Sequence, residues 1–199
     1  MWLFHKIIRL LYVYARIACI NIRPYPFLFN KPKRKVYSSI LETIHADILF
    51  TEKERRLIYA AANDITNFTN NIIQFEFKFD VIDYSFFHDK SILIKVLSSN
   101  EKIKQSDLEH ASKTIGLCAW RRNLTKELYL VDDRLSHSSN LFRTTLAHEL
   151  GHFIGLSHID KKGLMHPINN QLSPHPNYYD AMHLAHFWKC DPNDLAYFK

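Results

Sequence analysis

Apolar side chains recur with two different periods in the first half of the chain, and these periods predict a helix followed by strands. Between residues 52 and 70 apolar residues recur every three or four positions, which predicts an amphipathic helix. Residues 73–81 alternate strictly between apolar and polar, the period of a half-buried strand. Residues 91–97 are almost all apolar and predict a central strand. Two further strands, at 115–120 and 127–131, complete the predicted sheet.

The second half of the chain carries helical patterns. Ser139 or Asn140 can cap a helix that runs from about Leu141 to Ile154. Its apolar stripe would pin it to the core, and the stripe consists of Phe142, Leu146, Leu150 and Phe153. The polar stretch 99–113 predicts a loop with a short helix. Helices and a sheet that follow one another in this order predict an α+β fold.

Residues 1–35 differ from the rest and predict a basic hydrophobic leader and linker, before a domain that spans residues 36–199. Three basic residues interrupt its apolar stretch, so it makes a poor membrane-spanning helix. Residues 1–23 could instead lie on an anionic membrane surface. A signal sequence, a pro-segment or an ordinary packed helix are the alternatives. Membrane association or export is therefore favoured over a soluble cytoplasmic location.

The net charge of +6 would ordinarily suggest nucleic acid as a partner, but its distribution argues otherwise. Eight of the 26 basic residues and none of the 20 acidic residues lie in residues 1–36. The remaining 18 basic and 20 acidic residues give the rest of the chain a net charge of about −2. We therefore expect no nucleic-acid partner.

The counts of cysteine, glycine and histidine direct attention to the C-terminal third. The three cysteines are widely spaced, so neither a disulfide framework nor a cysteine zinc site is indicated. Cys118 and Cys190 could pair in an oxidising environment, or serve as small buried apolar residues. Three of the four glycines lie at 151–163, and seven of the twelve histidines lie at or beyond 148. This clustering predicts a metal or catalytic site there.

The segment 148–158 contains the candidate metal-binding and catalytic residues. His148 and His152 are four residues apart, so both imidazoles project from one helical face and can bind one ion. Gly155 can adopt the positive φ that ends the helix, and His158 can then supply a third nitrogen. Three neutral imidazoles leave a fourth zinc position for water, as in catalytic sites. Glu149 can act as the general acid/base that activates this zinc-bound water.

These residues match the pattern H-E-x-x-H-x-x-G-x-x-H, and the chain resembles the metzincin metallopeptidases, most closely their matrixin branch. The resemblance implies a zincin-like α+β fold with a small mixed twisted sheet, an active-site helix and a C-terminal helix over residues 180–188. It implies that Met165 is the methionine of a turn beneath the metal. It also implies that a strand bordering the cleft binds extended substrate, through Gly116, Leu117, Cys118 and Ala119. The resemblance covers about residues 50–190, and residues 148–167 make it specific.

The chain departs from the matrixins in two respects. No cysteine switch precedes the domain, and no glycine-rich loop is present for a second zinc ion or for calcium, so a single catalytic zinc ion is expected. His88, Asp89 and His110 are interpreted as solvated surface residues because they lack ligand spacing. His183 and His186 are expected to be packed or solvent-facing.

The sequence therefore predicts a zinc-dependent metalloendopeptidase that acts on protein or peptide substrates. Three alternatives remain open at this point. The first is a zinc exopeptidase or a dedicated processing peptidase. The second is a non-catalytic zinc-stabilised binding module. The third is a membrane-binding or nucleic-acid-binding protein driven by the basic leader.

Overall fold

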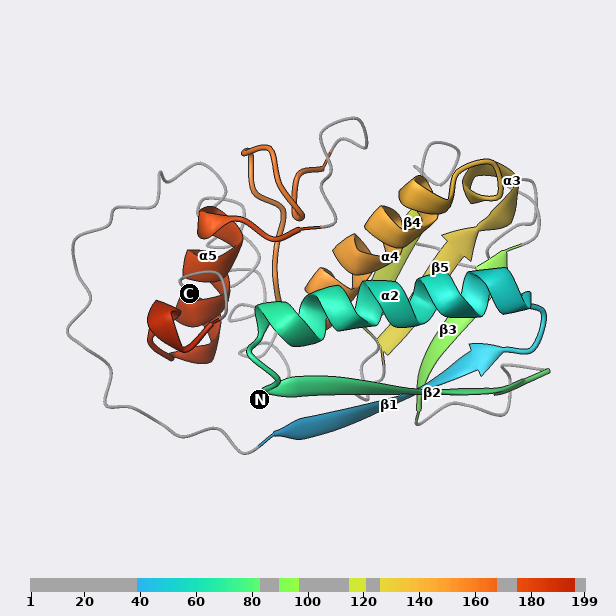
Figure 1. Ribbon diagram of the computed structural model, residues 1–199, viewed down its shortest axis with the longest axis horizontal. Coiled ribbons are helices and arrows are strands. Elements are labelled where there is room, and N and C mark those ends of the chain that lie inside the picture. Colours follow the sequence, from blue (N-terminus) through green and yellow to red (C-terminus); the bar gives the residue numbers. More distant parts are fainter. Residues whose placement is uncertain (1–38, 83–89, 97–114, 121–125, 168–174, 196–199) are drawn as a thin grey trace, which may run out of the picture. The chain divides into compact units, whose positions relative to one another are not determined.

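The computed structural model describes residues 39–82, 90–96, 115–120, 126–167 and 175–195, which form an α+β fold (Figure 1). The predicted leader over residues 1–35, the loop over 99–113, and His88, Asp89 and His110 lie outside the described residues. The described elements are β1 (Ile40–Asp47), α2 (Glu52–Phe68), β2 (Ile73–Val81), β3 (Ser91–Val96), β4 (Gly116–Trp120), β5 (Lys126–Val131), α3 (Asp132–Leu135), α4 (Ser139–Phe153), α5 (Tyr178–Trp188) and the 3₁₀ helix η4 (Pro192–Asp194). In the part of the chain thus described, no helix is long and apolar enough to cross a membrane.

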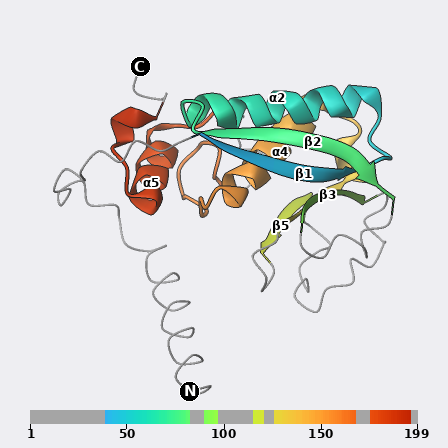
Figure 2. The same ribbon diagram turned by 90° about the horizontal axis from the view of Figure 1, so that it is seen from below.

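The five strands form one mixed sheet in the order β2-β1-β3-β5-β4. Strands β2, β1, β3 and β5 are parallel, and Figure 2 shows them in that order. Strand β4 pairs antiparallel with β5 and lies at one edge of the described sheet. This mixed sheet confirms the predicted sheet type.

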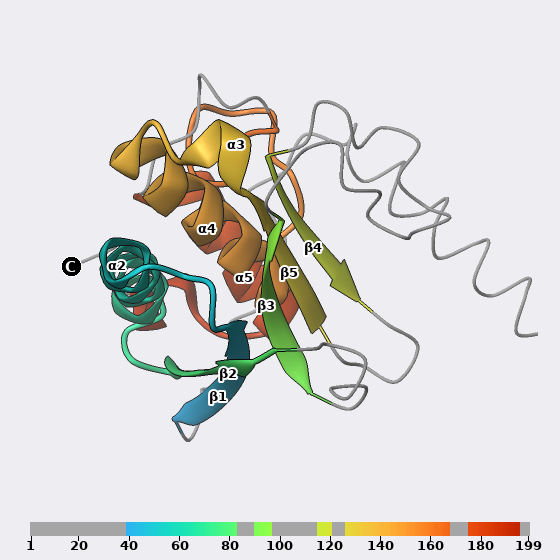
Figure 3. The same ribbon diagram turned by 90° about the vertical axis from the view of Figure 1, so that its right-hand side faces the viewer.

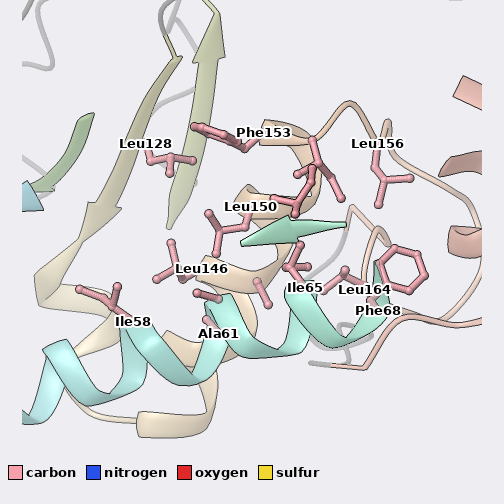
Figure 4. Packing of buried hydrophobic residues seen from close by; sticks show 14 of the residues in the cluster. Ile58, Ala61, Ile65, Phe68, Leu128, Leu146, Leu150, Phe153, Leu156 and Leu164 are labelled. Atoms are coloured by element: carbon pink, nitrogen blue, oxygen red, sulfur yellow. The ribbon is translucent and has the colours of Figure 1, made fainter. Parts of the chain in front are cut away.

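Helices α2 and α4 pack on the same face of the sheet, as the view along α2 in Figure 3 shows. Apolar side chains of the two helices meet in one core with side chains of the sheet and of the C-terminal segments (Figure 4). The predicted apolar stripe of α4 is confirmed: Phe142 is 3% exposed, and Leu146, Leu150 and Phe153 are fully buried. A second apolar cluster on β3 and β5, with Ile94 and Tyr129 among its members, lies on the opposite face of the sheet.

Two ion pairs fix the position of α2. Arg143 of α4 donates to both carboxylate oxygens of Asp64 on α2, at 2.8 and 2.6 Å. Lys95 of β3 lies 2.9 Å from Glu54, with both side chains largely buried. Glu54 also completes a capping box with Thr51 at the N-terminus of α2. The first pair joins α2 to α4, the helix that carries two of the histidines, and the second pair joins α2 to the sheet.

Three structural features differ from the sequence predictions. The N-cap of α4 is Ser138, whose hydroxyl accepts from the Leu141 N–H at 3.2 Å, so neither Ser139 nor Asn140 caps the helix as predicted. Strand β1 was not predicted, because its first two residues are exposed, the next two are half-buried and its second half is buried on both faces between β2 and β3, which leaves no regular alternation. The C-terminal helix begins at Tyr178, two residues before the predicted start, because Asn177 and Asp180 form a capping box there.

Candidate metal centre

Three histidines converge at the C-terminal end of α4. His148 and His152 lie one helical turn apart, and their ring centroids are 4.7 Å apart. Gly155 adopts a φ of 108°, in the region that favours glycine, and so confirms the predicted positive φ after the helix. The chain then turns back and brings His158 against both of the other rings.

Hydrogen bonds to backbone carbonyls determine which nitrogen of two of the histidines carries the proton. His148 Nδ1 lies 2.6 Å from the Leu164 carbonyl oxygen, and His152 Nδ1 lies 2.8 Å from the Leu156 carbonyl oxygen. A carbonyl oxygen only accepts hydrogen bonds, so both Nδ1 atoms are donors. In the neutral rings the Nε2 atoms therefore keep their lone pairs, as metal ligands must.

The spacing of the three Nε2 atoms fits a zinc ion. His158 Nε2 lies 3.2 Å from His148 Nε2 and 3.2 Å from His152 Nε2. Tetrahedral zinc with Zn–N bonds of about 2.0–2.1 Å would separate its nitrogen ligands by about 3.3 Å. In the described part of the chain this is the one group of histidine, cysteine and acidic side chains whose donor atoms are close enough to hold a metal ion.

The surroundings of His148 and His158 favour the neutral form of these two imidazoles. Burial lowers the pKa of His148 to about 3, helped by the proximity of His152. Burial also lowers the pKa of His158, and His166 contributes to this shift. Metal ions bind the neutral imidazole, so no proton has to be displaced near neutral pH.

Glu149 follows His148 on α4 and lies against strand β4. The residue is 5% exposed, and burial raises the pKa of its carboxyl group to about 8. The backbone N–H of Cys118 on β4 donates a hydrogen bond to this carboxyl group and opposes that rise in pKa. A cation bound by the adjacent histidines would further favour the carboxylate form. A group poised between its two protonation states near neutral pH suits general acid/base chemistry.

Met165 and Gly151 pack together next to the histidines. Met165 is fully buried, and a Cβ atom at Gly151 would lie 2.5 Å from the Met165 sulfur. The glycine thus leaves room for the methionine directly beside His152, on the helix that carries two of the three histidines. The structure shows Met165 buried against Gly151, while its role in a methionine turn beneath a metal stays a prediction.

Among the described residues, strand β4 lies at the edge of the sheet and next to Glu149. Val131 N donates to Ile115 O at 3.0 Å, and the alternation of an antiparallel pair then directs the backbone groups of Gly116 and Cys118 away from β5. Leu117 and Ala119 pack instead with the apolar cluster on the opposite face of the sheet. Of the four residues predicted to bind substrate, Gly116 and Cys118 thus face the candidate site with their backbone, and the side chains of the other two do not.

Gly116 allows β4 to approach α4 closely, and this contact yields a prediction. A Cβ atom at Gly116 would lie 2.6 Å from Thr145 Cγ2 and 2.9 Å from Glu149 Oε1. Replacing a glycine in a strand by alanine usually stabilises a protein, but here Gly116→Ala should lower the free energy of unfolding by about 1–3 kcal/mol. Denaturant unfolding measures the change.

A double-mutant cycle tests the cause of that loss. Thr145→Ser removes the Cγ2 atom and keeps the hydroxyl group, so the pair Gly116→Ala/Thr145→Ser should lose less stability than the sum of the two single changes. Additive losses, or a Gly116→Ala protein as stable as the wild type, would contradict the close contact.

The remaining candidate residues lie outside the cluster of three histidines. His183 is half-buried and His186 is exposed, both on α5, in agreement with the sequence prediction. His166 is buried and lies 3.9 Å from Asp160, on the loop that carries His158. Cys190 is buried, Cys118 is half-buried, and these two residues form no disulfide with each other.

Sequence reasoning missed the backbone partners of the site. The carbonyl groups of Leu164 and Leu156 orient two imidazoles, and the Cys118 N–H binds Glu149. Backbone groups are identical at every position, so the sequence holds no signal for them. For Asp180, whose buried carboxylate binds the loop at Leu164, the sequence does hold a signal. This residue stands three positions after Asn177, in a capping-box pattern.

Comparison with known proteins identifies no family for this chain. No protein-family model matches it, and no curated protein matches its sequence. Among solved structures, the one described as "GM1 bound form of the ECX AB5 holotoxin" aligns with a TM-score of 0.37 and 11% sequence identity, over 77% of this chain and 74% of that chain. A similarity this distant identifies neither a fold family nor an activity.

Proposed function

We propose that the chain is a zinc-dependent endopeptidase in which His148, His152 and His158 hold the ion and Glu149 is the general acid/base. One observation carries the proposal: three Nε2 atoms, two of them fixed as lone-pair donors, converge next to a buried carboxyl group, with that of His158 3.2 Å from each of the other two. Three protein ligands are typical of catalytic zinc sites, whereas structural sites have four.

The residues divide the work of amide hydrolysis. A zinc ion held by the histidines would supply a Lewis acid that polarises a peptide carbonyl and acidifies water. Glu149 takes a proton from the attacking water at its carboxylate oxygen and delivers it to the leaving nitrogen as the C–N bond breaks. The Cys118 N–H orients that carboxylate from the β4 side.

The edge of β4 is our proposed site for the peptide chain. An extended substrate could add to the sheet next to β4 and hydrogen-bond with the backbone groups of Gly116, which point away from β5. Backbone pairing holds a peptide largely independently of its side chains. This arrangement would place a peptide bond alongside Glu149, and it favours internal cleavage over trimming of chain ends.

The motif over residues 148–158 and the turn at Met165 support membership of the metzincins, in a form similar to the matrixins. We infer a zincin-like arrangement from the order of elements in this chain, in which a helix and a mixed sheet precede the helix of the three histidines. The ion expected is a single catalytic zinc.

Metal removal tests the proposal. The purified full chain should bind one zinc ion, cleave an unfolded protein such as reduced casein, lose this activity in a chelator, and regain it when zinc is restored. Elemental analysis gives the stoichiometry, and mass spectrometry of the products locates the cuts. Internal fragments support an endopeptidase, whereas stepwise loss of terminal residues would indicate an exopeptidase. Zinc binding without any cleavage would indicate a binding module.

A further inference from the structure

Helix α5 contributes one buried charge to the loop that passes beside the three histidines. The Asp180 carboxylate is 1% exposed and accepts from the N–H of Asn177 at 2.7 Å, within the capping box of α5. It also accepts from the N–H groups of Leu164 and Met165, each at 3.3 Å. Capping a helix needs only the first of these contacts, so the other two call for a different explanation.

The contact with Met165 reaches His148 through a single peptide group. The Met165 N–H and the Leu164 carbonyl belong to the same amide, and they point in opposite directions along it. The N–H end donates to Asp180 Oδ1 at 3.3 Å, and the carbonyl end accepts from His148 Nδ1 at 2.6 Å. A carboxylate, an amide and an imidazole thus form one continuous chain of hydrogen bonds that ends at the candidate metal ligand.

Such a chain acts on the ligand electronically as well as sterically. A negative charge at the N–H end of an amide polarises it, so its carbonyl becomes a stronger acceptor. A stronger acceptor at Nδ1 raises the electron density at Nε2 of the same ring and fixes the ring's orientation. In many zinc sites a carboxylate bonded directly to the ligand histidine has this effect. Here the carboxylate lies one peptide group further away.

We propose that Asp180 is a positioning residue that strengthens metal binding by His148 through the amide between Leu164 and Met165. The inference rests on the metal-binding part of the proposed function and is independent of peptidase activity. It assigns α5 a role in the site as well as in the core, since Asp180 is the residue through which α5 reaches the amide that binds His148.

The test measures zinc binding by full-length variants. Asp180→Asn keeps the size of the side chain but removes its charge, and it leaves one oxygen to serve three N–H groups. We expect zinc affinity to fall about 10–100-fold, the usual effect of losing an outer-shell partner of a ligand histidine. Competition with a chromogenic chelator gives the dissociation constant. The visible spectrum of the cobalt-substituted protein should also change, because the orientation of His148 changes.

A matched control separates this effect from loss of a helix cap. Asp191→Asn makes the same chemical change at the cap of η4, where Asp191 accepts from Asn193 N at 2.9 Å. That variant should bind zinc as the wild type does. If Asp180→Asn does not fold, Asp180→Glu tests the role of Asp180 in zinc binding. This variant keeps the charge but adds a methylene group at a buried position. It should bind zinc several-fold more weakly than the wild type.

The outcomes are distinct. A folded Asp180→Asn protein, or failing that Asp180→Glu, with wild-type zinc affinity and an unchanged cobalt spectrum would overturn the inference while leaving the metal centre intact. A wild-type protein that binds no zinc would overturn the metal centre and this inference together. Weakened zinc binding in Asp180→Asn, in a chain that cleaves no peptide, would support this inference and reject the proposed peptidase activity.

Discussion

Glu149→Gln should lower the rate of peptide hydrolysis by about 10²–10⁴-fold, the range in which a general acid/base contributes to catalysis. Glutamine has the shape of glutamate and can still accept from the Cys118 N–H, so the packing around β4 should be kept. It cannot take up a proton from water or return one to the leaving nitrogen. Steady-state cleavage of a fluorogenic peptide measures the loss.

Zinc binding and stability should survive this substitution. Glu149 is not one of the three residues that could hold the metal ion, and burial already favours its neutral form, which glutamine resembles. Glu76→Gln is the matched control, because Glu76 lies exposed on β2 at the other edge of the described sheet. Its activity should equal that of the wild type. A Glu149→Gln protein that binds zinc and cleaves at the original rate would exclude the proposed mechanism.

Periodicity predicted those elements whose environment is uniform along their length. Strand β2 has one face in the core and one toward solvent over all nine residues, so alternation located both of its ends. The apolar stripe of α4 likewise faces the core at every turn, and Leu146, Leu150 and Phe153 are fully buried. In such elements the local pattern contains the tertiary information.

Elements with a changing environment escaped prediction. Strand β1 passes from an exposed beginning to an end buried between two strands, so no single period describes it. The start of α4 was placed too late because three consecutive polar residues, Ser138, Ser139 and Asn140, all suit a cap. Only the hydrogen bond from Leu141 N shows that Ser138 fills the role.

The candidate site likewise contains some features that the sequence predicts and others that it does not. The three histidines that the structure brings together, His148, His152 and His158, were predicted from residue type and spacing alone, whereas the role of Glu149 stays a prediction. Their supports were not predicted, because the Leu164 carbonyl and the Cys118 N–H are backbone groups brought in by tertiary contacts. The tautomers of His148 and His152 follow from those contacts, so ligand competence is a property of the fold as much as of the motif.

His158→Ala should abolish tight zinc binding at little cost to the metal-free fold. His158 lies in the loop after α4 and is exposed, so few core contacts are lost. Outer-shell changes cost about 10–100-fold in affinity, and removing one of three ligands should exceed that, at about 10³-fold or more. Because ligands that bind only the folded state raise its stability, saturating zinc should raise the melting temperature of the wild type and not that of the variant. Calorimetry with and without zinc measures the melting temperatures of both proteins. His186→Ala, at an exposed position, is the control. A wild-type zinc affinity in His158→Ala would show that His158 is not part of the site.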